Sequence, residues 1–197
     1  MIRAQRKSDA KSELMSREWE KRILSKRKVK RFSELTLCEE AWFRAADDLI
    51  EAMALVEPRI KDYWQKASSQ LLDANNEEEL PPLGLVNVHM MLAGFAVENL
   101  CKGFLAARLA KREKAQAKAG VLPKSLRTHD IPALVERVGM SVSETDSYLL
   151  ERLGEAVWRG RYSIPTDHKR IQPFAQFASD VRRTRAILQK LRKHVGG

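Results

Sequence analysis

Apolar residues recur along most of this chain at intervals of three and four positions. Between residues 38 and 53 they keep to one face of a 3.6-residue repeat, and the pattern resumes from 60 to 71. Pro58 lies between the two stretches and has no backbone N–H, so we expect it to end or kink the helix. No alternating strand pattern of useful length appears. The sequence therefore predicts an all-α fold, an up-and-down bundle of about five to six helices.

The central part of the chain predicts the most deeply buried helix, over residues 83–114. Its apolar residues surround most of the helical girth, which is typical of a helix in the middle of a bundle. Before it, residues 73–82 are acidic and polar and end in two prolines, so they are expected to form a loop. Thr36 and Glu39 have the spacing of a capping box, which predicts that the first helix of the domain begins near Thr36.

Capping residues divide the second half of the chain. Asp130 and Ser143 are expected to cap the N-termini of two helices. Gly139 and Gly160 are expected to end these helices in the left-handed conformation. The last helix is expected to open near Pro173.

Positive charge is concentrated at the N-terminus. Residues 1–31 hold twelve Lys or Arg and four Asp or Glu, so eight of the ten net positive charges lie there. We therefore separate a basic N-terminal arm, residues 1–33, partly disordered or helical, from a helical domain, residues 34–197. Such an arm suits phosphate groups or an acidic partner. The alternative is a solvated tail without a binding role.

Several functional classes are not expected. Cys38 and Cys101 are far apart and have no second Cys or His at ligand spacing, so no metal site is predicted, and no cofactor motif appears. The longest apolar run, residues 90–97, is too short to span a bilayer, and the first residues lack the apolar core of a secretory signal. We expect a cytoplasmic protein, not one of the membrane, with both thiols buried and free.

The first candidate site lies around residues 158–168. Arginine can hold a phosphate through two parallel hydrogen bonds, and histidine can move a proton to or from a ribose hydroxyl. A proline-containing loop could bring His168 beside Arg161, forming a metal-free ribonuclease site. The neighbouring residues expected to bind RNA or phosphate are Trp158, Arg159, Tyr162, Lys169 and Arg170.

These residues also have a structural interpretation. Trp158 and Tyr162 would then anchor the core, and the arginines would pair with acids such as Glu98 or Asp167. His168 would be an ordinary loop residue.

A second polar cluster interrupts the central apolar helix. Glu98 and Lys102 are one helical turn apart and can pair, and Asn99, His129 and Asp130 could join them. We favour a buried polar network that fixes helix packing, since buried polar groups need partners before they need a function.

Three runs of this chain resemble the HEPN domain family. They are AVENLCKGFL at 96–105, HDIPAL at 129–134 and WRGRYSIP at 158–165, and the resemblance covers about residues 36–195. It implies a helical bundle that forms a homodimer and, in many members, a metal-independent endoribonuclease of toxin–antitoxin, phage-defence or RNA-processing systems. The family motif is an Arg followed a few residues later by a His. Here six residues separate Arg161 from His168, at the long end of that spacing.

The resemblance implies roles for both residues. His168 would transfer the proton, Arg161 would neutralise the scissile phosphate, and two motifs would face each other across the dimer. Tyr162 stands where active members usually have a polar residue. The alternative is therefore a non-catalytic HEPN-like module that binds a protein partner, such as an antitoxin, or nucleic acid.

Overall fold

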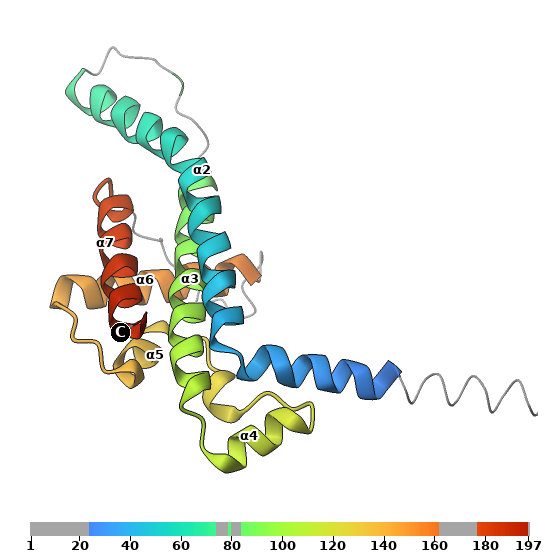
Figure 1. The fold of residues 1–197 in the computed structure, drawn as a ribbon. Coiled ribbons are helices and arrows are strands. Elements are labelled where there is room, and N and C mark those ends of the chain that lie inside the picture. Colours follow the sequence, from blue (N-terminus) through green and yellow to red (C-terminus); the bar gives the residue numbers. More distant parts are fainter. Residues whose placement is uncertain (1–23, 74–78, 80–83, 162–176, 197) are drawn as a thin grey trace, which may run out of the picture.

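The computed structural model describes residues 24–73, 79, 84–161 and 177–196, with the side chain of Arg161 excepted. Every regular element in these ranges is a helix, which confirms the predicted all-α bundle (Figure 1). The central helix is α3 (Gly84–Ala107). It contacts α2 (Glu39–Leu72), α5 (Ile131–Val138), α6 (Glu144–Arg161) and α7 (Asp180–Gly196). The apolar core therefore gathers around α3.

The first described helix spans residues 24–37 and projects from the base of the bundle (Figure 1). Cys38 follows it as an extended residue, which precedes α2 and makes no side-chain capping bond. The predicted capping box is therefore wrong. Thr36 is buried in the preceding helix, and its carbonyl oxygen accepts a hydrogen bond from Trp42 Nε1 at 3.1 Å. This helix also crosses the expected boundary between residues 33 and 34.

Helix α2 continues through Pro58, so the proline does not end it, but the C-terminal part of α2 bends away from the rest, which agrees with the predicted kink (Figure 1). Its fully buried residues, Ala46, Met53 and Ile60, recur at intervals of seven and form a seam against α3. The C-terminal part of α2 extends past the other helices, and Leu71 and Leu72 near its end are exposed (Figure 1).

Helix α3 is buried around most of its girth, as predicted. Two glycines allow close helix packing. A Cβ at Gly94 would lie 2.5 Å from Val157 Cγ2 of α6, and one at Gly103 would lie 2.6 Å from Phe43 of α2. By length and composition α3 could cross a membrane, with a mean hydropathy of 1.3, but 61% of its most apolar window is buried inside the protein. Burial of this kind is typical of the core helix of a bundle.

The predicted helix 83–114 is in fact two helices. Helix α3 ends at Ala107, and α4 (Lys111–Lys118) follows after a short break. Gly120 follows α4 with a positive φ of 81°, and Val29 of helix 24–37 lies against it. Helix 24–37 therefore packs against the end of α4. A 3-10 turn, η1 (Lys124–Leu126), leads on to α5.

The predicted caps of α5 and α6 are confirmed. Asp130 Oδ1 accepts a hydrogen bond from the backbone N–H of Ala133 at 3.1 Å, and Gly139 ends α5 with a φ of 82°. Ser143 Oγ accepts a hydrogen bond from the backbone N–H of Asp146 at 3.1 Å. Both caps are local, so sequence spacing alone could identify them.

Two other predicted helix ends are wrong. Gly160 is helical inside α6, which continues to Arg161. A Cβ at Gly160 would overlap Met91 Sδ, so close packing against α3 favours a glycine here. Helix α7 begins at Asp180 after a turn at 178–179, not near Pro173, which lies outside the described residues.

Candidate functional site

The arginine–histidine motif begins at the C-terminal end of α6. This helix ends at Arg161, whose side chain is not described. Tyr162, His168, Lys169 and Arg170 lie outside the described residues. The expected approach of His168 to Arg161 therefore lies outside the described part of the chain as well.

The described residues next to this motif are Trp158 and Arg159. Arg159 Nε donates to Glu155 Oε1 at 2.8 Å, one turn earlier on α6, and the two side chains are 33% and 37% exposed. This partner differs from the acids expected for it, Glu98 and Asp167. Trp158 is half-buried. A phosphate that binds Arg159 would have to share the guanidinium with Glu155.

The second predicted cluster forms a buried network centred on Glu98. Lys102 Nζ donates to Glu98 Oε1 at 2.7 Å, and both residues are less than 7% exposed. Nδ1 of His129 lies 2.9 and 3.0 Å from the two oxygens of the same carboxylate. Lys102 Nζ also lies 5.9 Å from the centre of the Trp42 ring. The network therefore joins α2, α3 and the residue before the α5 cap.

Two other residues of the predicted cluster have different positions. Asp130 caps α5, as described above, and Asn99 is half-buried on α3. His129 is the exposed member, with 46% of its side chain accessible. The Glu98 carboxylate is therefore shielded from solvent and held by two donors. This arrangement is typical of a group that fixes helix packing.

Cys101 lies next to this network on α3 and is fully buried. Burial, and then the charge of Glu98, raise the pKa of the Cys101 thiol to about 12. A thiol in this state is a poor nucleophile. Cys38, by contrast, is half-buried, so the expectation that both thiols are buried holds only for Cys101.

A third polar cluster, which sequence reasoning missed, joins α2, α3 and α7. His89 Nε2 lies 3.3 Å from Glu57 Oε1, and Arg185 donates two hydrogen bonds to the same carboxylate. Burial lowers the pKa of His89 to about 4, against the opposing charge of Asp180. His89 is therefore neutral near pH 7, and Arg185 supplies the positive charge that Glu57 requires. The signal in the sequence was a histidine inside the apolar stretch of α3.

A fourth cluster holds α7 against α6. Arg152 and Asp180 form a buried two-bond ion pair, with Nη2 to Oδ1 at 2.8 Å. Asp180 Oδ2 also accepts a hydrogen bond from the backbone N–H of Phe177 at 2.9 Å. The rings of Tyr148 and Phe177 lie 5.0 and 4.8 Å from the guanidinium carbon. A planar guanidinium stacked in this way fixes the start of α7.

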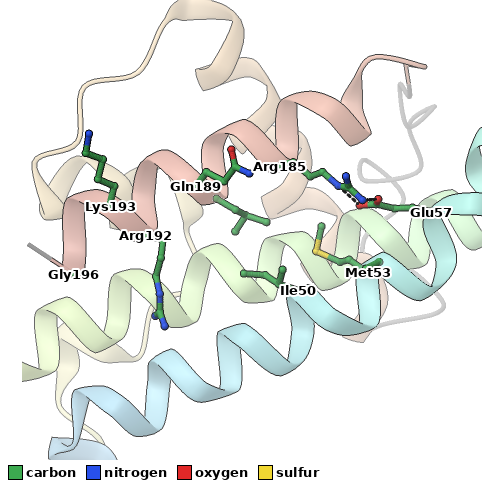
Figure 2. A pocket seen from close by; sticks show the side chains of 10 residues that line it. Ile50, Met53, Glu57, Arg185, Gln189, Arg192, Lys193 and Gly196 are labelled. Carbon is green, nitrogen blue, oxygen red and sulfur yellow. Dashed lines mark hydrogen bonds and ion pairs between the residues drawn. The ribbon is translucent and has the colours of Figure 1, made fainter.

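A groove of about 800 Å³ separates α2 from α7 (Figure 2). Its apolar lining includes Ile50, Met53 and Leu188, and Arg185 spans it to reach Glu57. Arg192 reaches across it to Asp47, at 2.7 Å. The basic side chains of this groove are therefore largely paired with acids of α2.

Among the described residues, no group of three or more His, Cys, Asp or Glu is arranged to hold a metal ion. No known protein family matches this chain, and no curated protein or solved structure matches it either.

Proposed function

We propose that this protein is a metal-independent endoribonuclease of HEPN type that acts as a homodimer in the cytoplasm. The observation that carries the proposal is the position of Arg161 at the last residue of α6, with His168 seven positions later. Arg159 lies two residues earlier, so the last turn of α6 carries two arginines directly before the segment that contains His168.

These residue types suit RNA cleavage. The ribose 2′-hydroxyl attacks the neighbouring phosphorus while the bond from phosphorus to O5′ breaks. Arg161 neutralises the charge that builds on the phosphoryl oxygens. One His168 accepts the proton of the 2′-hydroxyl, and the partner's His168 donates a proton to O5′. The products are a 2′,3′-cyclic phosphate and a 5′-hydroxyl.

The bundle supplies a rigid support for such a site. Helix α6 packs against α3 at Gly94, and the buried Arg152–Asp180 pair joins it to α7. The backbone of Arg161 is therefore held by a rigid helix, which positions a functional group more precisely than a loop does.

An enzyme that cuts cellular RNA must be kept inactive until it is needed. We therefore propose a role as a toxin, phage-defence or RNA-processing effector, with an antitoxin as a partner.

The test is cleavage of RNA by the purified full-length chain in excess chelator. His168→Ala and Arg161→Ala should each lower the rate by about a hundredfold or more, since acid–base transfer and charge stabilisation each contribute about that much. His194→Ala and Arg182→Ala are matched controls far along the chain and should cut normally. Equal cutting by all variants, or cutting only with added metal, would refute the proposal.

The alternative is a non-catalytic module that binds a protein partner or nucleic acid, and Tyr162 next to Arg161 favours it. RNA that is bound but never cut, under all ionic conditions, would assign this function instead.

A further inference from the structure

We propose that the hollow between helix 24–37 and α4 is a binding site for the phosphate backbone of RNA. The choice of RNA over DNA rests on the ribonuclease proposed above, whereas the phosphate site itself does not.

The first support is charge. Helix 24–37 and α4 together hold nine Lys or Arg and two Glu, and all nine basic side chains are exposed. The two helices lie at the same end of the molecule (Figure 1). They meet where Val29 packs on Gly120. Their charges therefore add to one positive surface instead of two separate ones.

The second support is that these charges are mostly not offset by acids. The basic side chains of α7 serve as a comparison, because several of them have partners: Arg185 pairs with Glu57 and Arg192 with Asp47. Lys190 Nζ donates to the carbonyl oxygen of Ser141 at 2.6 Å. For helix 24–37 and α4, the ion pair found among the described residues is Lys30–Glu34 at 4.0 Å, with the lysine 81% exposed. The excess charge is therefore available to an external anion.

The third support is the shape of the contact. A hollow of about 470 Å³ lies between the two helices, with Lys26 and Lys30 on one wall and Lys118 on the other. Ser25, Val29, Ser33 and Glu34 also line it, and the Glu34 carboxylate is offset by its ion pair with Lys30. Ammonium and hydroxyl groups are the donors that hold phosphate oxygens. Among the described residues no aromatic side chain lines this hollow, so we expect contacts to the backbone without stacked bases and without sequence preference.

A nucleic acid fits this surface better than an anionic membrane. A helix that lies on a membrane needs a continuous exposed apolar face. In helix 24–37, Val29 and Phe32 are half-buried against the protein, and the exposed apolar residues, Leu24 and Leu35, are separated by about three turns.

The test is fluorescence anisotropy with a labelled 2′-O-methyl RNA of about 20 nucleotides, which the proposed nuclease cannot cut because it lacks a free 2′-hydroxyl. Lys26→Ala/Lys118→Ala removes one charge from each wall. Arg182→Ala/Lys193→Ala removes the same charge from exposed positions of α7. The first variant should bind about tenfold more weakly at 0.1 M salt, and its slope of log affinity against log salt should fall by about 1.4. The second should bind within about twofold of the wild type.

Equal losses in the two variants, no loss in the first, or tighter binding to phosphatidylserine vesicles than to RNA would overturn this inference. Its failure is separable from that of the ribonuclease. If Lys26→Ala/Lys118→Ala binds normally while His168→Ala abolishes cutting, only the proposed phosphate site is refuted. If binding is lost as expected and no protein cuts RNA, only the proposed ribonuclease activity is refuted.

Discussion

The buried pair of Glu98 and Lys102 yields the sharpest prediction about stability. At 2.7 Å, two unit charges attract by about 6 kcal/mol at an effective dielectric constant of about 20. Much of this attraction offsets the cost of removing both charges from water. A variant that removes one partner therefore loses more than one that removes both.

We expect Lys102→Met and Glu98→Gln each to lower the free energy of unfolding by about 3–5 kcal/mol, because each leaves a buried charge without its counter-charge. The loss for Lys102→Met should lie at the lower end of this range, since His129 still contacts the Glu98 carboxylate. The loss of unfolding free energy in the double variant should be smaller than the sum of the two single losses by at least about 2 kcal/mol.

The measurement is urea denaturation of the four proteins, followed by circular dichroism at pH 7. A domain of ordinary stability has about 5–15 kcal/mol, so each single loss is well resolved. If the losses of the two single variants simply add in the double variant, the two buried charges do not stabilise each other. Unchanged stability combined with loss of RNA cutting would instead make Glu98 part of the functional site.

Three further predictions concern other buried positions. Gly94→Ala should destabilise the bundle by about 1–3 kcal/mol because its Cβ meets Val157 and a backbone oxygen of α6, whereas Gly160→Ala meets only flexible Met91 and should cost less than about 1 kcal/mol in thermal melts. The His89 pKa of about 4 lies below its unfolded value of 6.5, so the stability that neutral His89 provides is lost as pH falls through that window. That loss is about 2 kcal/mol between pH 7 and pH 5, and denaturation of His89→Gln should show a correspondingly smaller change. In the native protein, Ellman's reagent should titrate Cys38 but not Cys101, and urea should expose both thiols.

The sequence could predict what local spacing determines. The caps at Asp130 and Ser143 depend on residues within three positions, and Glu98 and Lys102 are one turn apart. All three were predicted correctly. The pair of Glu57 and Arg185, by contrast, joins residues 128 positions apart, and they come together only because α2 and α7 both pack on α3.

The differences between predicted and observed helix ends also have physical causes. Pro58 does not end α2 because Ala54, whose carbonyl oxygen would have accepted its hydrogen bond, is exposed, so that oxygen can be hydrated. Gly160 looked like a terminator, but it accommodates Met91 of α3. The start of α2 was predicted near Thr36, but the helix begins at Glu39, after the break at Cys38. The basic stretch before Thr36 has scattered apolar residues, so the sequence did not show that residues 24–37 are helical as well.

The ends of the RNA fragments that the full-length protein produces in excess chelator distinguish this mechanism from others. We expect 2′,3′-cyclic phosphates and 5′-hydroxyls, made by the wild type and lost in His168→Ala. Ends with 3′-hydroxyls and 5′-phosphates, or the same products from His168→Ala at the wild-type rate, would contradict it.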